Sequence, residues 1–306
     1  MSEKLATVRS RMRRLKTLPV LPTILTAGNL ASGITAILCA AHYEKQSHPW
    51  MLEMGAIMIF VAMICDMLDG KVARMTKTDG PFGAELDSLS DVVSFGVAPA
   101  ILVHRLVLGE PGVFDHGQRL LWFMTVFYPV MAAIRLARYN VEHTDVPLPY
   151  FRGIPSPGAA AVVCSWIIFH QEVLQPPNSA LGYRYDGLET LDTWRWVIIG
   201  LTMASALLMV STVRYPHVGQ TLLGRLGFRQ MIVGILLVSL LIWKPPYFLV
   251  IATTGYLLLG LGGEAMAMWR KWRLGRSLIE DADEDEAEDA GVIGEKHHDT
   301  GPAPGR

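Results

Sequence analysis

Charged residues are scarce in this chain: Asp, Glu, Lys and Arg make up 18% of its 306 residues, against about 25% in an ordinary soluble domain. Hydrophobic residues make up 51%. Cysteine is also rare, and Cys39, Cys65 and Cys164 all lie within apolar stretches. That placement excludes a disulfide framework and a paired-cysteine metal site. The composition therefore favours a membrane protein without thiol chemistry.

The net charge of −1 conceals an uneven distribution of charge. Residues 277–306 carry 10 acidic and two basic residues, which leaves 25 Lys and Arg against 18 Asp and Glu in the rest of the chain. The basic residues alternate with long apolar runs and do not form one stripe, so no nucleic-acid partner is expected. Membrane lipids are the expected surroundings.

Long apolar runs dominate the sequence. A transmembrane helix needs about 20 mostly apolar residues, and eight segments meet or approach this length. They predict an all-α fold, a polytopic membrane helix bundle of about eight transmembrane helices. The predicted spans are residues 21–42, 51–72, 84–108, 120–137, 157–173, 194–213, 231–243 with their flanks, and 247–268.

Lys and Arg in the connections predict the orientation. The side that holds both termini has 19 of them, and the opposite side has six. Cytoplasmic connections carry the excess of basic residues, so both termini are expected in the cytoplasm. Residues 1–20 form a basic amphipathic segment, which suits either a helix on an anionic membrane surface or a simple basic flank that sets the orientation.

Four carboxylates flank the connection between the second and third predicted spans. Asp66 and Asp69 are three residues apart and Asp87 and Asp91 are four apart, so each pair occupies one helix face. Two antiparallel helices joined by a short turn would bring these faces together near the cytoplasmic boundary.

Several like charges in a partly desolvated place need compensation. Lys71 and Arg74 could pair with two of the carboxylates, and the alternative is that all four are solvated residues at helix ends. Oxygen-rich clusters select Mg²⁺ or Mn²⁺, and two ions about 3.5 to 4 Å apart would form a clamp for a diphosphate. Gly70, Ala73 and Gly83 leave room beside it.

The segment reads D-x2-D-G-x2-A-R-x8-G-x3-D-x3-D from Asp66 to Asp91. This pattern resembles the complete signature of the CDP-alcohol phosphotransferase family. The strings DSLSDVVSFGVAPA (87–100), RLARYN (135–140) and FRGIPSP (151–157) are similar to its phosphatidylserine synthase branch. The family commonly has Pro-Asn where this chain has Pro22 and Thr23.

The resemblance implies roles for the matched positions. Asp66, Asp69 and Asp87 would coordinate two divalent metal ions, Mg²⁺ or Mn²⁺, and Asp91 would be a further ligand and the catalytic general base. The CDP-binding residues would be Gly70, Ala73, Arg74 and Gly83. The implied reaction transfers the phosphatidyl group of CDP-diacylglycerol to L-serine and releases CMP, without a covalent enzyme intermediate.

Cations near the cytoplasmic ends of the fourth and fifth predicted spans are candidates for binding the acceptor. Arg135, Arg138 and Arg152 could each hold the serine carboxylate, or they could be basic flanks that contact lipid phosphates. Asn29 suits ligand contact and helix–helix hydrogen bonding equally. Ser94 and Ser156 could line the acceptor site or only pack helices.

Other functions remain open at this point. Within the family, glycerol phosphate or inositol phosphate could replace serine as acceptor. A cation transporter is disfavoured, because the aspartates lie at one end of their spans and no repeat is visible. The domain organisation is a transmembrane catalytic domain, residues 21–268, and a cytoplasmic tail, residues 269–306, acidic and disordered from about residue 280. The family implies a homodimer. The expected location is the cell (inner) membrane, with a cytoplasmic active site as the distribution of Lys and Arg predicts.

Overall fold

The computed structural model describes residues 20–44, 47–76, 81–108, 117–142, 150–174, 188–216 and 239–296. Nearly all of this part is helical, and the sheet found in it consists of two strands of three residues each. The predicted all-α class is therefore confirmed. The basic N-terminal segment and most of the predicted span at 231–243 lie outside the described residues.

Helices α2 (Val20–Ala41) and α3 (Met51–Thr76) lie side by side. Close to this pair, Gly55 permits a tight approach of α5: a Cβ at Gly55 would lie 2.7 Å from Leu102 Cδ2 and 3.2 Å from the Ala36 carbonyl oxygen. Small residues at such contacts let membrane helices pack closely.

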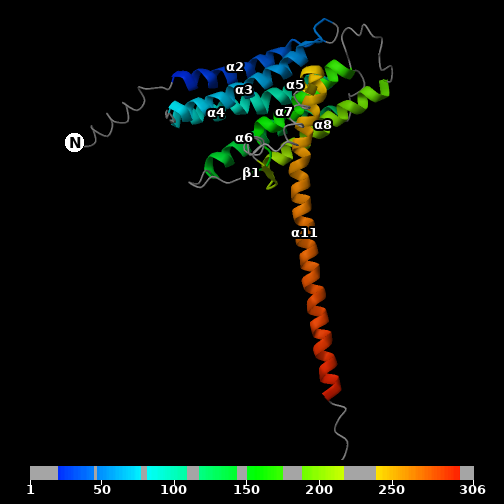
Figure 1. Cartoon of the computed structure of the whole chain (residues 1–306). Helices are drawn as coiled ribbons and strands as arrows, with labels where there is room; N and C mark the ends of the chain where they lie inside the picture. Colours follow the sequence, from blue (N-terminus) through cyan, green and yellow to red (C-terminus); the bar gives the residue numbers. More distant parts are fainter. Residues whose placement is uncertain are drawn as a thin grey trace, which may run out of the picture. The chain divides into compact units, whose positions relative to one another are not determined.

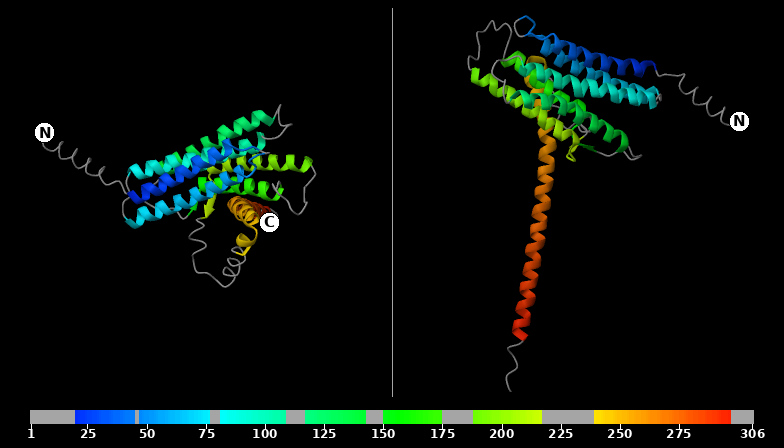
Figure 2. Two further views of the ribbon diagram at one scale, coloured as in Figure 1. Left: turned by 90° about the horizontal axis from the view of Figure 1, so that it is seen from above. Right: turned by 180° about the vertical axis from the view of Figure 1, so that it is seen from behind.

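The third predicted span is built from three consecutive helical segments, α4 (Pro81–Asp91), the π-helix η1 (Val92–Val97) and α5 (Ala98–Leu108). Helix α2 packs against all three as well as against α3, as the arrangement in Figures 1 and 2 also shows. Helix α2 is thus the common support of α3 and α4.

The next helices are α6 (Gly117–Glu142), α7 (Ser156–Phe169), which continues into the π-helix η2 (His170–Leu174), and α8 (Leu188–Val210). Strands β1 (Tyr150–Arg152) and β2 (Arg214–Pro216) pair antiparallel, next to the start of α7 and the end of α8. Gly153 follows β1 with a φ of 77°, and a Cβ there would lie 2.9 Å from the Leu208 carbonyl oxygen. Glycine is therefore needed at this position.

Helix α11 spans Pro245–Lys296, and the chain divides into two compact units between Leu258 and Leu259. In the first unit, Trp166 Nε1 on α7 donates a hydrogen bond to Thr254 Oγ1 on α11 at 3.0 Å. The acidic run is helical up to Lys296, whereas the sequence predicts disorder from about residue 280. Alanine and glutamate favour helix even where there is no apolar face to bury. The division into three domains stays a prediction.

Five of the described helices are long and apolar enough to span a membrane, and they match the first four predicted spans and the eighth: Leu21–Ala41, Met51–Ala73, Phe82–Leu108, Gln118–Val141 and Pro245–Met266. The sixth corresponds to a shorter apolar helix, Trp194–Val210, and the fifth to the 14-residue α7 with η2. The protein is therefore a multi-pass membrane protein, while the count of eight stays a prediction.

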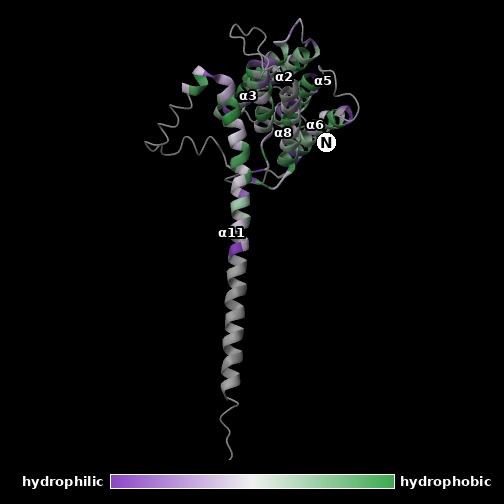
Figure 3. Cartoon of the chain, turned by 90° about the vertical axis from the view of Figure 1, so that its right-hand side faces the viewer, coloured by the Kyte–Doolittle hydropathy of each residue, from purple (hydrophilic) through white to green (hydrophobic). Residues whose placement is uncertain are grey.

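Apolar side chains occupy both the inside and the outside of the first unit. Phe95, Leu102 and Met124 are fully buried between helices. Trp122 and Phe123 are more than half exposed on α6, and Figure 3 shows the hydrophobic colouring of α2, α3 and α6. An apolar outer surface of this kind is stable in lipid and costly in water.

Candidate functional site

Three carboxylates come together between α3 and α4. Asp66 and Asp69 lie near the end of α3, and Asp87 lies on α4. Each offers an oxygen, and these three atoms all lie within 4.8 Å of one another. Asp69 is buried, while Asp66 and Asp87 are half-buried. The structure thus brings together three of the four aspartates predicted to converge.

Helix α2 fixes the cluster from one side. Thr26 Oγ1 donates a hydrogen bond to Asp69 Oδ2 at 2.9 Å, and it also approaches the Pro22 carbonyl oxygen at 3.1 Å. Thr26 itself is buried. Because α2 packs against both α3 and α4, a single helix sets the distance between the two carboxylate-bearing helices.

The donor set of this cluster fits a divalent cation. Asp87 Oδ1 is buried, and no hydrogen-bond partner is found for it among the described residues. A buried carboxylate oxygen without a donor is costly, and two nearby carboxylates add to the repulsion. A hard cation with oxygen ligands, such as Mg²⁺ or Mn²⁺, would remove both costs.

Asp91 has different surroundings, although it lies only one helical turn beyond Asp87. It is buried, and Asn29 Nδ2 on α2 donates a hydrogen bond to its Oδ1 at 3.1 Å. Ser94 Oγ on η1 donates to the Asn29 carbonyl oxygen at 3.0 Å. Asp91 also interacts electrostatically with Asp66 and Asp87. It therefore borders the cluster and is held by α2.

Close helix packing makes this arrangement possible. A Cβ at Gly33 would lie 2.8 Å from Ser94 Cα, so only glycine lets α2 and η1 approach to this distance. The π-helix begins directly after Asp91, and π-turns often occur at functional sites.

The three candidate acceptor arginines differ in their positions. Arg135 Nη1 donates a hydrogen bond to Ser156 Oγ at 2.8 Å, and the guanidinium interacts electrostatically with Asp91 and Asp66. Arg138 Nη1 donates to the Val210 carbonyl oxygen at 3.3 Å, and Arg152 is exposed. Of these three, Arg135 is the one whose described interactions connect it to the carboxylates.

The positions predicted to bind CDP surround the same place. Gly70 and Ala73 are half-buried near the end of α3, and a Cβ at Gly83 on α4 would meet no described atom within 4 Å. Among the described residues, nothing fills the space at Gly83, one helical turn before Asp87. The backbone of Arg74 lies within α3, but its side chain is outside the described part. Lys71 is exposed.

Sequence reasoning missed Thr26 and left two roles open for Asn29. In the structure Asn29 makes a helix–helix hydrogen bond, and its partner is Asp91. The available signal was the three-residue spacing of Thr26 and Asn29, which places two polar side chains on one face of an apolar helix. Such residues need partners within a membrane.

Comparison with known proteins decides the family. The sequence profile of the CDP-alcohol phosphatidyltransferase family matches residues 19–208. The chain belongs to the CDP-alcohol phosphatidyltransferase family. This match includes the carboxylate cluster, Asn29, Asp91 and Arg135, whereas β2 and α11 follow it. CDP-alcohol phosphatidyltransferases generally use a divalent metal, in agreement with the acidic cluster.

Three relatives within this family share the name CDP-diacylglycerol--serine O-phosphatidyltransferase. The protein from Helicobacter pylori is 30% identical over 241 residues, which cover 78% of this chain and 89% of the relative. The Bacillus subtilis protein is 29% identical over 199 residues, 64% of this chain and 90% of the relative. The Mycobacterium leprae protein is 34% identical over 162 residues, 51% of this chain and 49% of the relative.

Proposed function

We propose that this protein transfers the phosphatidyl group of CDP-diacylglycerol to L-serine, giving phosphatidylserine and CMP in phospholipid biosynthesis. The observation that carries the proposal is the group of Asp66, Asp69 and Asp87 oxygens within 4.8 Å of one another, bordered by Asp91 and Arg135. The names of the relatives from H. pylori, B. subtilis and M. leprae support the choice of acceptor.

The donor substrate would bind at the carboxylate cluster. Asp66, Asp69 and Asp87 would hold two divalent ions, Mg²⁺ or Mn²⁺, with Asp91 as a further ligand. Bound there, the ions would neutralise the diphosphate and polarise its phosphorus–oxygen bonds. Gly70, Ala73 and Gly83 would leave space for the nucleotide, and Arg74 would compensate phosphate charge.

Asp91 would act as general base. In the displacement, the serine hydroxyl oxygen forms a bond to the lipid-side phosphorus while the bond from that phosphorus to the bridging oxygen breaks. The hydroxyl proton passes to Asp91, and the bridging oxygen leaves with CMP. The hydrogen bond from Asn29 to Asp91 Oδ1 would fix the carboxylate and leave its other oxygen for this proton.

Arg135 would bind the serine carboxylate. Its guanidinium is placed beside Asp91 by the hydrogen bond to Ser156, and guanidinium binds carboxylates with two parallel hydrogen bonds. Arg138 and Arg152 are weaker candidates, because one donates to the backbone of α8 and the other is exposed. A phosphorylated acceptor such as glycerol phosphate or inositol phosphate would require a denser group of cations.

The excess of Lys and Arg on one side supports a cytoplasmic active site and cytoplasmic termini, in a cell (inner) membrane. A homodimer is part of the same proposal, and it would be tested by the mass of the protein in a membrane mimetic.

The deciding experiment incubates purified protein with CDP-diacylglycerol, radiolabelled L-serine and either Mg²⁺ or Mn²⁺, and follows labelled lipid and CMP. We expect equimolar phosphatidylserine and CMP, and no product with chelator. Parallel reactions with glycerol phosphate and inositol phosphate test the acceptor. Preference for either of these over serine would contradict the proposal.

A further inference from the structure

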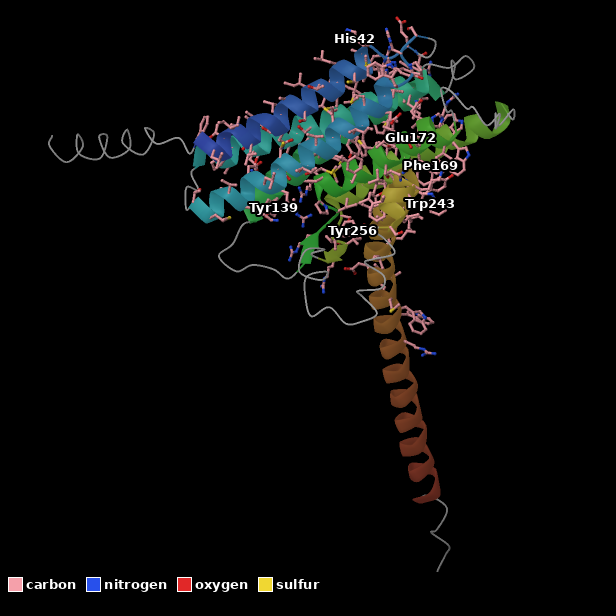
Figure 4. All side chains as sticks on the ribbon, turned by 45° about the horizontal axis from the view of Figure 1, so that its top comes forward. His42, Tyr139, Phe169, Glu172, Trp243 and Tyr256 are labelled. Carbon is pink, nitrogen blue, oxygen red and sulfur yellow. The ribbon has the colours of Figure 1, made fainter. Side chains whose placement is uncertain are left out.

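Tyr256 and Arg135 both contact the start of α7, Tyr256 at Gly158 and Arg135 at Ser156, although Tyr256 comes from a helix that follows the part matched by the family profile. The matched part ends at residue 208, whereas Tyr256 lies on α11. The Tyr256 side chain is half-buried and interacts electrostatically with the Arg135 guanidinium. Figure 4 labels Tyr256 on α11 and Tyr139 on α6. A segment outside the family match thus reaches the candidate acceptor arginine.

The described contacts of Arg135 come from three helices. Ser156 at the start of α7 accepts its hydrogen bond at 2.8 Å, and its guanidinium carbon lies 5.5 Å from the centre of the Tyr139 ring on α6. Tyr256 on α11 interacts electrostatically with the same guanidinium. Together these groups hold one guanidinium next to Asp66 and Asp91, where a small anionic substrate would meet it.

Packing fixes the Tyr256 ring at this position. A Cβ at Gly158 would lie 3.4 Å from Tyr256 Cε1, so glycine on α7 makes room for the ring. The ring of Tyr215 on β2 stacks at a tilt, with 5.4 Å between the ring centres. One turn earlier on α11, Thr253 Oγ1 lies 2.8 Å from Ser165 Oγ on α7. These contacts with α7 and β2 restrict movement of the Tyr256 side chain.

The Tyr215 hydroxyl of this ring pair has its partner on α11. Tyr215 donates a hydrogen bond to the Leu257 carbonyl oxygen at 3.4 Å. Burial raises the pKa of Tyr215 to about 12, so its hydroxyl remains a donor at neutral pH. The described interactions of Tyr256 include the charge of Arg135, and those of Tyr215 do not.

A guanidinium and a phenol side by side form a good binding site for a carboxylate. The guanidinium supplies charge and two parallel donors, and the phenol adds one further directed O–H. Such hydrogen bonds are stronger when little water competes, as between these packed helices.

We propose that Tyr256 is a specificity-determining residue, which donates a hydrogen bond to the carboxylate of the acceptor while Arg135 binds the same group. This inference rests on the proposed transfer to serine. It assigns α11 a part in the acceptor site, so the chain completes this site with a helix that the family profile does not include.

The test compares Tyr256→Phe with Tyr215→Phe in the full-length protein. Both changes remove one hydroxyl from the same ring pair and keep the aromatic packing. We expect Tyr256→Phe to raise the KM for serine about 10-fold, the value of a hydrogen bond to a charged group. The kcat and the KM for CDP-diacylglycerol should change less than about twofold, and Tyr215→Phe should keep the normal KM for serine.

A double variant shows whether the two side chains act on one group. Arg135→Lys combined with Tyr256→Phe should raise the KM for serine by less than the product of the single effects, because residues that share a partner are coupled. An unchanged KM in Tyr256→Phe, an equal rise in both phenylalanine variants, or fully multiplicative effects would each overturn the inference. If the unmodified protein makes no phosphatidylserine from serine, the proposed function itself fails.

Discussion

At the scale of single residues, the four aspartates of one motif have separate environments. Asp69 accepts a hydrogen bond from Thr26, Asp91 accepts one from Asn29, and Asp87 has a buried oxygen without a described donor. The sequence motif alone does not distinguish these four carboxylates. Their surroundings separate them into a group suited to metal and a neighbour suited to a proton.

Replacing any member of the three-carboxylate cluster should abolish activity. In Asp66→Asn, Asp69→Asn and Asp87→Asn, an amide lowers the charge available to a divalent cation. We expect no labelled phosphatidylserine above background at any Mg²⁺ or Mn²⁺ concentration, while the protein still elutes as a single species from a sizing column. Near-normal turnover in one variant would remove that residue from the essential ligands.

Asp91→Asn should affect turnover more than donor binding. General base catalysis contributes about 10² to 10⁴-fold, so kcat should fall by that factor. The KM for CDP-diacylglycerol should change little, because a base acts mainly in the transition state. A parallel collapse of donor affinity would show that Asp91 is chiefly a metal ligand.

The three arginines provide a matched series. Arg135→Lys should raise the KM for serine, because an ammonium group cannot reproduce the two parallel hydrogen bonds of guanidinium. Arg138→Lys and Arg152→Lys should leave the KM for serine near normal, because Arg138 donates a hydrogen bond to a backbone carbonyl of α8 and Arg152 is exposed. Normal serine kinetics in Arg135→Lys would place the carboxylate elsewhere.

The sequence predicted the aspartates because their spacing acts locally, within single helices. It could not choose among Arg135, Arg138 and Arg152, since the choice depends on Ser156 and on helices distant in the chain. Tyr256 was missed for the same reason: it lies 121 positions after Arg135, and an isolated tyrosine in an apolar span carries no signal.

At the scale of elements, α2 controls the site without contributing a carboxylate. Its Thr26 and Asn29 reach α3 and α4 respectively, and its Gly33 allows Ser94 to come close. The short connection between α3 and α4 predicted that their carboxylate faces meet, and three of these carboxylates do come together. Both helices also pack on α2, which the sequence did not predict, because the polar face of α2 satisfies groups on each of them.

Gly33→Ala should destabilise the protein and lower its activity. The added Cβ would lie 2.8 Å from Ser94 Cα, which cannot move without shifting the η1 backbone. Overpacking of this kind costs about 1 to 3 kcal/mol, so the unfolding temperature in detergent should fall. Gly200→Ala on α8 is the control, since no described atom lies within 4 Å of a Cβ there. Equal melting temperatures for the two variants would contradict the role of Gly33.

At the scale of the whole molecule, orientation follows from the 19 to six distribution of Lys and Arg. In a protein lacking its three native cysteines, a cysteine introduced at Asn178 should react with an impermeant thiol reagent applied to intact cells. A cysteine at Thr78 should react only after the cells are opened. The reverse pattern would invert the proposed topology.

The carboxylate cluster and the proposed acceptor residues come from helices that are made at different times during protein synthesis. Asp66, Asp69, Asp87, Asp91 and the α2 residues that support them precede Arg135 in the chain, so the ribosome makes them first. Arg135, Ser156 and Tyr256 follow in three later helices. Because chains fold from the N-terminus during synthesis, a nascent chain can assemble the carboxylate cluster before the proposed acceptor residues have all been translated. A product truncated ahead of α11 would then retain divalent metal binding while its affinity for serine is weakened.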